Sequence, residues 1–280
     1  MSLKLLKRDD LLVSLFEERY RKQLVSMWQE AFSDTEEYIN GFFDSRCAKT
    51  YVYSENEVPM GMVSVFDITL NGNKGAYIYA LTVDKAYRRK GVATALIGVV
   101  QESLSEDGYS FSLVVPSPYQ ALESFYKKLG YEGEIGLGVT KYCREQGNFS
   151  FDFEKATPSE YLAVRQKQKN IVLHSQNFYN YIYNDLICEG VEILKIKIDL
   201  KDVFCVCYNK GEYVIIKELL GETDPKNVAQ IVMRIFDAPK SACISFRGEK
   251  RYPYALVSGF GADCDFIYAN LLLDDFENRF

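Results

Sequence analysis

Apolar side chains change their spacing once in the first half of the chain, near residue 90. Residues 75–83 read GAYIYALTV, an uncharged stretch rich in aromatic and β-branched residues, and predict a buried strand that stops near Asp84. From Gly91 onward, apolar residues recur at helical spacing until about Ser105. The pattern therefore predicts a strand, a short turn and an amphipathic helix, in that order.

Similar patterns flank this segment on both sides. Residues 109–115 (YSFSLVV) alternate as a strand does and are followed by Pro116, and residues 117–133 predict a short helix. Upstream, residues 18–47 predict two helices, and the stretch between them and Gly75 predicts strands joined by Asn- and Gly-containing turns. The first half thus predicts helices followed by strands around the central strand, turn and helix.

The second half repeats this order. We place a domain boundary near residue 150, so that residues 1–150 and 151–280 form two domains. Thr157-Pro158-Ser159-Glu160 predicts a helix start, with a helix to about Lys169. Residues 178–187 predict another helix, strands follow with a hairpin turn at residues 209–211, and residues 226–236 predict a last helix. The predicted fold class is α/β (α+β).

Three cations occupy the turn before the central helix of the first half. Arg88, Arg89 and Lys90 directly precede Gly91. The first N–H groups of a helix lack partners within the helix, and together with the helix dipole they favour an anion. Gly91 would let a ligand approach the backbone, Ala93 keeps the next turn small, and the cations can donate charge-assisted hydrogen bonds. We expect a pyrophosphate here, and the alternative is a solvated basic loop.

Composition excludes several classes of protein. The 280 residues are 48% hydrophobic and carry a net charge of −6, which disfavours a general nucleic-acid binder. The seven cysteines are scattered and include no C-x-x-C pair, so neither a disulfide framework nor a metal site is expected. Apolar runs are too short to cross a membrane and no signal peptide is visible, so we expect a cytoplasmic protein. The G-x-G-x-x-G and G-x-x-x-x-G-K-[ST] loops are absent, which disfavours hydride transfer and nucleotide hydrolysis.

The turn and the helix after it resemble the GNAT acetyltransferase superfamily. Residues 88–93 match the family's [Q/R]-x-x-G-x-[G/A] signature, which holds the pyrophosphate of acetyl-CoA, and residues 117–133 resemble its F/L-Y-x-K-x-G-[FY] ending. The resemblance implies two tandem GNAT-like domains, each with a mixed, mainly antiparallel sheet flanked by helices. It implies that the strands at residues 79–83 and 111–115 splay apart, and that pantetheine pairs with the main chain in the gap. The residues it assigns to acetyl-CoA are Leu81, Thr82, Val83, Arg88, Arg89, Lys90, Gly91, Val92, Ala93, Thr94 and Ser124.

The same resemblance assigns a catalytic role to Tyr126, whose phenol would donate a proton to the departing CoA thiolate. The alternative is that Tyr126 belongs to the apolar stripe of a short helix. The family often carries a glutamate base on the strand before the basic loop, but residues 78–80 contain no carboxylate. A water, Tyr79 or a group from the second half could replace it.

Residues 18–47 are similar to the W-x-x-A-F-x-D-x-x-E-[FY] opening of the Eis-like subgroup, which carries a second, degenerate GNAT unit. This similarity implies an acceptor pocket lined by Trp28, Phe32 and Phe43, with Tyr79 nearby, although core packing also explains such residues. The sterol-carrier-like domain of that subgroup is expected to be missing.

The second half departs from the pattern of a cofactor site. Its loop before the last helix carries Glu222 and Asp224 where arginines would be needed, and acidic groups repel phosphate. We expect residues 151–280 to form a degenerate GNAT-like domain. Glu218 lies on the preceding strand and is assigned a salt-bridge role, while His174, the only histidine, is assigned a surface or capping role in polar surroundings.

The sequence thus predicts an N-acetyltransferase that moves an acetyl group from acetyl-CoA directly to a primary amine in a ternary complex, without a metal. One alternative is an acyl-CoA-binding regulatory or interaction protein, and another is an aminoacyl-tRNA-dependent aminoacyltransferase. The acceptor stays open among small amines, aminoglycosides, peptide N-termini and lysines, and so does the oligomeric state.

Overall fold

The computed structural model describes residues 6–8, 11–147, 150–188, 190–245 and 250–259. The chain divides into two compact units, each composed of segments that are separate in the sequence. The first unit comprises Met1–Glu134, His174–Tyr181 and Ala255–Ala262, and the second comprises Ile135–Leu173, Ile182–Tyr254 and Asp263–Phe280. The predicted division at residue 150, between a catalytic and a degenerate domain, stays a prediction.

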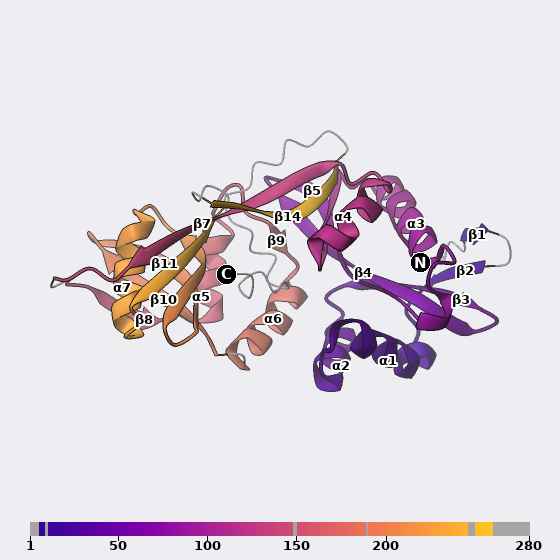
Figure 1. Cartoon of the computed structure of the whole chain (residues 1–280), viewed down its shortest axis with the longest axis horizontal. Helices are drawn as coiled ribbons and strands as arrows, with labels where there is room; N and C mark the ends of the chain where they lie inside the picture. Colours follow the sequence, from indigo (N-terminus) through magenta and orange to yellow (C-terminus); the bar gives the residue numbers. More distant parts are fainter. Residues whose placement is uncertain (1–5, 9–10, 148–149, 189, 246–249, 260–280) are drawn as a thin grey trace. The chain divides into compact units, whose positions relative to one another are not determined.

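The first unit contains a mixed sheet that is mainly antiparallel. Its strands follow the order β1-β2-β3-β4-β5-β6-β14 (Figure 1), and among the described residues β5 and β6 form its parallel pair while the other pairs are antiparallel. The strands are β1 (Leu6–Arg8), β2 (Leu11–Leu15), β3 (Lys49–Glu55), β4 (Val58–Leu70), β5 (Asn73–Val83), β6 (Phe111–Val114) and β14 (Lys250–Gly259).

Helices pack on both faces of this sheet. Successive side chains of a strand point to opposite faces, and in β5 both sets of side chains are covered. Tyr79 of β5 lies among aromatic rings of α1 (Arg21–Phe32) and α2 (Glu36–Ser45), and the ring of Tyr77 contacts that of Tyr79. The alternate residues Ala76 and Ile78 belong to an apolar cluster with α3 (Val92–Glu106) and α4 (Tyr119–Lys127). Short 3-10 helices, η1 (Glu18–Tyr20) and η2 (Lys85–Tyr87), precede α1 and α3.

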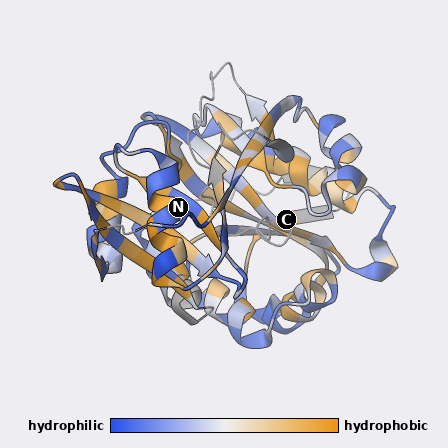
Figure 2. Ribbon diagram, turned by 60° about the vertical axis from the view of Figure 1, so that its left-hand side comes forward, coloured by the Kyte–Doolittle hydropathy of each residue, from blue (hydrophilic) through white to orange (hydrophobic). Residues whose placement is uncertain are grey.

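The second unit repeats the mixed sheet. Its strands follow the order β7-β13-β12-β11-β10-β8, and in the described part of the unit β12 and β13 are parallel while the other pairs are antiparallel. Its elements are β7 (Gly133–Cys143), β8 (Asp152–Lys155), α5 (Pro158–Arg165), β10 (Val191–Ile198), β11 (Lys201–Asn209), β12 (Tyr213–Leu220), α7 (Pro225–Ile235) and β13 (Lys240–Ser245). β9 (Leu173–His174), α6 (Gln176–Cys188) and β14 are divided between the units, because His174–Tyr181 and the residues of β14 from Ala255 onward belong to the first. The helices carry hydrophobic residues on one side and hydrophilic residues on the other (Figure 2).

The two units share one arrangement of strands and helix. In the first unit β5 pairs with β4, the chain crosses through α3, and β6 returns parallel to β5. In the second unit β12 pairs with β11, the chain crosses through α7, and β13 returns parallel to β12. The predicted fold class, with mainly antiparallel mixed sheets flanked by helices, is therefore confirmed.

Most predicted elements are confirmed, with one difference in length. The capping box of Thr157 and Glu160 forms as predicted and opens α5. This helix was expected to reach Lys169, but it ends at Arg165. The following residues 166–170 are all polar, so they offer no apolar face for a further helical turn to bury.

Candidate active site

The basic turn lies where the sequence predicted it, between β5 and α3. Asp84 caps the η2 turn by accepting a hydrogen bond from the N–H of Ala86 at 2.8 Å. Arg89 and Gly91 then adopt positive φ angles of 63° and 86°. A Cβ atom on Gly91 would meet nothing within 4 Å, so the backbone conformation explains this glycine and steric crowding does not.

The amino end of α3 carries no side-chain cap among the described residues. Gly91 occupies the N-cap position, and the first intrahelical bond runs from the N–H of Ala95 to the carbonyl of Gly91 at 2.9 Å. Val92 is buried, Ala93 is half-buried and Thr94 is exposed. The N–H groups of the first turn therefore end beside exposed basic residues, which is the arrangement that binds an anion.

The two arginines of the turn differ in their contacts. Arg88 donates from Nε to the carbonyl of Val83 at 2.9 Å and forms an ion pair through Nη2 with Glu30 at 3.1 Å. Lys85 also pairs with Glu30, at 3.0 Å. Arg88 thus ties the turn to β5 and α1, whereas the exposed Arg89 forms no ion pair with the described residues.

The edge of β5 opens just before this turn. The parallel ladder between β5 and β6 runs from the pair Gly75 and Phe111 to the pair Ile78 and Val114, while β5 continues to Val83. On its other side, β5 remains paired with β4 as far as Val83. Since β6 ends at Val114, the main chain of β5 beyond Ile78 has one edge that β6 does not pair, and the predicted splay of the two strands stays a prediction.

A β-bulge lies at the start of the open edge. Met62 pairs with Thr82 and Ser64 pairs with Tyr79, so β5 carries one extra residue, and Ala80 adopts a φ of 49°. The bulge reverses the alternation of side chains. Tyr79 lies on the face covered by α1 and α2, while Leu81 and Val83 pack against the apolar cluster of α3 and α4.

Thr82 has a structural contact. Its buried hydroxyl donates to the carbonyl of Met27 in α1 at 3.5 Å, so the side chain fastens β5 to α1. Any contact of Thr82 with a cofactor would come from its backbone. Ser124, also predicted to touch the cofactor, is exposed on α4.

Tyr126 lies buried on α4, where its ring contacts Phe125 and Tyr131 at centroid distances of 5.0 and 5.9 Å. It belongs to the apolar cluster that includes Leu96 of α3 and Val114 of β6, at the end of the strand ladder. Among the described residues its hydroxyl has no hydrogen-bond partner. Burial raises the pKa of Tyr126 above its ordinary value, with a smaller contribution from Tyr131. The phenol is therefore protonated at neutral pH.

Tyr131 differs from Tyr126 in having a partner for its hydroxyl. It accepts a hydrogen bond from Ser112 Oγ at 3.1 Å, and burial raises the pKa of Tyr131 to about 12. Its oxygen is thus engaged within the fold, which leaves the Tyr126 hydroxyl as the candidate proton donor of this pair.

The three aromatic residues predicted for an acceptor pocket separate into two groups. Trp28 and Phe43 are buried in the core of the first unit, where their rings lie 5.9 Å apart. Phe32 is 42% exposed at the end of α1. Trp28 also donates from Nε1 to Asp34 at 2.7 Å. These positions match the core-packing alternative for Trp28 and Phe43.

Tyr79 has partners that the sequence did not reveal. Its hydroxyl lies 3.1 Å from the hydroxyl of Tyr38 on α2, and the hydroxyl of Tyr181 on α6 donates to the Tyr38 carbonyl at 3.2 Å. Tyr38 was recognised only as part of an apolar helix pattern. No sequence signal pointed to Tyr181, because it comes from a distant segment that folds onto the first unit.

His174 lies in surroundings that differ from the prediction. Its ring stacks on Phe178 with centroids 3.7 Å apart and lies 6.1 Å from Phe66, edge to face. The expected polar surroundings are therefore wrong. The residues directly after His174, at positions 175–177, are polar, whereas its neighbours in space are aromatic residues of β4 and α6.

The corresponding loop of the second unit has the opposite character. Asp224 caps α7 by accepting a hydrogen bond from the N–H of Lys226 at 2.9 Å, and Glu222 pairs with Lys201 at 3.2 Å. A carboxylate therefore occupies the position at which α3 leaves its amino end uncapped. This loop does not present the groups that an anion needs.

Glu218 has the predicted salt-bridge role. It is fully buried on β12 and pairs with the fully buried Arg165 of α5, with Nε 2.9 Å from Oε1. Tyr161 donates its hydroxyl to the same carboxylate, and Arg165 also donates to the carbonyl of Val172. Both ions are thus surrounded by partners.

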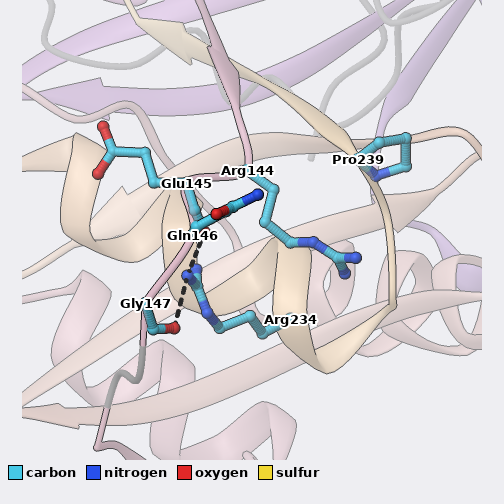
Figure 3. A pocket seen from close by; sticks show the side chains of 6 residues that line it. All are labelled: Arg144, Glu145, Gln146, Gly147, Arg234 and Pro239. Carbon is cyan, nitrogen blue, oxygen red and sulfur yellow. Dashed lines mark hydrogen bonds between the residues drawn. The ribbon is translucent and has the colours of Figure 1, made fainter.

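A polar pocket of about 570 Å³ lies elsewhere in the second unit (Figure 3). It is lined by Arg144, Glu145, Gln146, Gly147, Arg234 and Pro239. Arg234 donates to the carbonyls of Glu145 and Gly147 at 2.7 and 3.5 Å, and Arg144 pairs with Asp237 at 2.7 Å. Both guanidinium groups are engaged within the fold, and neither belongs to the predicted site.

The described part of the chain lacks two further features. Within it, no cluster of three or more histidine, cysteine, aspartate or glutamate side chains could hold a metal ion. Nor does any helix there combine the length and the apolar character that crossing a membrane requires.

The first unit thus combines a bulged strand that extends beyond its parallel neighbour, a basic turn, and a helix without a side-chain cap among the described residues. Residues 12–131 match the sequence model of the Acetyltransferase (GNAT) family. Over these residues, which make up less than half of the chain, the protein is similar to the GNAT family of acetyltransferases. No curated protein matches the sequence.

Solved structures share the fold at low sequence identity. A GCN5-related N-acetyltransferase from Kribbella flavida is 14% identical with a TM-score of 0.68, covering 89% of this chain and 70% of that one. Eis1 from Mycobacterium abscessus is 10% identical with a TM-score of 0.65, covering 89% and 73%. A tandem GNAT protein of the clavulanic acid biosynthesis pathway is 10% identical with a TM-score of 0.56, covering 90% and 99%.

Proposed function

We propose that this protein is an acetyl-CoA-dependent N-acetyltransferase whose chemistry takes place in the first unit. The observation that carries this proposal is the open edge of β5 beyond Ile78, which leads directly into the uncapped amino end of α3. Together they offer main-chain groups for a chain of amides and a positive helix end for a diphosphate, which are two parts of coenzyme A.

The residues present fit such a ligand. The main chain near Leu81 and Val83 would pair with the amides of pantetheine along the open edge. The N–H groups of the first turn of α3 would bind the pyrophosphate oxygens, and Arg89 and Lys90 would add charge-assisted hydrogen bonds. Arg88 would act indirectly, because its bonds to Val83 and Glu30 hold the turn in place.

Acetyl-CoA would supply the acetyl group, and residues of this chain would hold and move the protons. Tyr126 is the proposed general acid, donating its hydroxyl proton to the departing thiolate sulfur. Burial raises the pKa of Tyr126, so the acid form persists up to and beyond the pH at which an ordinary tyrosine ionises, about 10.

The acceptor amine would attack the acetyl group directly in a ternary complex. Residues 78–80 of β5 provide no carboxylate base. We assign the removal of the amine proton to a water held at the bulge. A water is a weak base, so this assignment agrees with an acceptor amine that loses its proton easily. We further propose that the second unit is a degenerate GNAT-like domain of an Eis-like tandem protein, since its loop is acidic and its helix is capped.

The test is acetyl-CoA turnover with a panel of primary amines, including aliphatic and aromatic amines, an aminoglycoside and a lysine peptide. We expect turnover with at least one member, and a decrease in kcat of about 100-fold or more in Tyr126→Phe, with unchanged binding of acetyl-CoA. Tyr119→Phe is the matched control, because Tyr119 is also buried on α4. Equal turnover in Tyr126→Phe and Tyr119→Phe would exclude the acid role, and no turnover with any amine would reject the activity.

A further inference from the structure

Three tyrosines from distant parts of the sequence meet in the first unit. Tyr38 comes from α2, Tyr79 from β5 and Tyr181 from α6, and all three are half-buried. The hydroxyls of Tyr38 and Tyr79 lie 3.1 Å apart, and Tyr181 donates its hydroxyl to the Tyr38 carbonyl at 3.2 Å. We call Tyr38, Tyr79 and Tyr181 the tyrosine trio. Tyr38 thus contacts both other members, Tyr181 through its backbone carbonyl and Tyr79 through its hydroxyl.

The position of Tyr79 relates the trio to the proposed site. Tyr79 is the residue before the bulge at Ala80, on the face covered by α1 and α2. Leu81, proposed to pair with pantetheine, follows two residues later. At about 3.3 Å per residue, the two backbone positions lie within roughly 7 Å of each other. A group at the tyrosine trio is therefore within reach of the thioester end of a bound cofactor.

Three buried aromatic rings pack against Tyr79 of the tyrosine trio. Trp28, Phe42 and Phe66 lie 5.7, 5.8 and 5.5 Å from the ring of Tyr79. All three are buried, so they fix the orientation of the Tyr79 ring. Aromatic faces and phenol oxygens attract an amine, as a cation or as a hydrogen-bond donor, without a buried carboxylate. They also offer apolar surface to the group that carries the amine.

Tyr181 fixes this arrangement from the second half of the sequence. Its ring lies 5.8 Å from Tyr38 and 6.1 Å from Phe42, and its Cε2 atom lies 3.6 Å from the Cβ position of Gly41. The structure groups residues 174–181 with the first unit. Because Tyr181 bonds to the first turn of α2, it sets the position of Tyr38, whose hydroxyl in turn meets Tyr79.

We propose that Tyr79 contacts the acceptor, a primary amine carried on an apolar or aromatic group, and that Tyr38 and Tyr181 are positioning residues. This inference rests on the proposed acetyl transfer and specifies its acceptor side. It also gives the segment 174–181 a role in acceptor recognition.

The kinetic experiment uses the full chain with 2-phenylethylamine as the aromatic acceptor and glucosamine as the polar comparison. In Tyr181→Phe, which keeps the ring and removes the hydroxyl, we expect the KM for 2-phenylethylamine to rise about 5-fold to 10-fold while the KM for acetyl-CoA stays unchanged. Tyr79→Phe should raise it further. Tyr109→Phe is the matched control, because Tyr109 bonds to Asp67 and Lys49 at the other end of the β5–β6 ladder.

A second readout does not need turnover. Trp28 is the only tryptophan of the chain and lies against Tyr79, so its fluorescence reports on this region. Titration with 2-phenylethylamine should give a saturable change in wild type and Tyr109→Phe, and a curve shifted about 5-fold or more to higher amine concentration in Tyr181→Phe.

The outcomes separate this inference from the proposed function. Identical titration curves for wild type and Tyr181→Phe, no response of Trp28 to the amine, or tighter binding of glucosamine than of 2-phenylethylamine would each overturn the inference. The activity would stand if acetyl-CoA turnover persisted. Conversely, absence of acetyl-CoA binding would reject the proposed function, while the fluorescence titration would still decide whether the trio binds an amine.

Discussion

At the scale of single residues, charge and hydrogen bonding separate the two units. Arg89 and Lys90 are exposed beside an uncapped helix in the first unit, whereas Asp224 caps the corresponding helix of the second. The sequence predicts these differences, because charged residues just before a helix interact with the amino end of that helix. The contacts of Tyr38 and Tyr181 were not readable, since 143 residues separate two partners that only the fold brings together.

The buried ion pair of Arg165 and Glu218 permits a prediction of stability. Arg165→Met leaves a buried carboxylate without its cation, and should lower the free energy of unfolding by about 3–5 kcal/mol in urea titrations followed by circular dichroism. The double variant Arg165→Met/Glu218→Gln should be more stable than the single one, because no charge remains buried.

Arg144→Met supplies the control for that measurement. Its ion pair with the largely exposed Asp237 lies at the surface, so its loss should cost less than about 1 kcal/mol. A double variant less stable than Arg165→Met alone would show that the ionic partnership does not account for the effect.

At the scale of elements, local pattern predicted most helices and strands, including β5, α3, α4 and the hairpin of β11 and β12. Pattern could not predict which strands pair across the sequence. β7 follows α4 in the first half of the sequence and pairs with β13, while the last described strand, β14, pairs with β6. The bulge was also invisible, because alanine rarely adopts the positive φ of Ala80.

Two glycines around α3 make a matched test of the basic turn. Gly91 has a φ of 86°, so Gly91→Ala should cost about 1–2 kcal/mol of stability and weaken binding of coenzyme A by displacing the turn. Gly98 is exposed inside α3, with open space at its Cβ position. Gly98→Ala should therefore stabilise the protein by about 0.5–1 kcal/mol and leave coenzyme A binding unchanged.

Thermal unfolding and calorimetry would measure both variants. Equal effects of the two substitutions on coenzyme A affinity would contradict the role assigned to the backbone of the turn.

At the scale of the whole molecule, the same arrangement of strands and crossover helix occurs in both units, but we propose a cofactor site in the first unit alone. The first unit combines an open strand edge with an uncapped, basic helix end. The second has an acidic loop and a capped helix. One molecule of coenzyme A should therefore bind to each chain.

Calorimetric titration of the full chain with coenzyme A tests this central claim most directly. We predict one site per chain with micromolar affinity, which weakens as salt rises because phosphate contacts are screened. Arg89→Glu should weaken binding strongly, since it places a negative charge at the phosphate position. No heat of binding in wild type, two sites per chain, or an affinity that Arg89→Glu leaves unchanged would contradict the account.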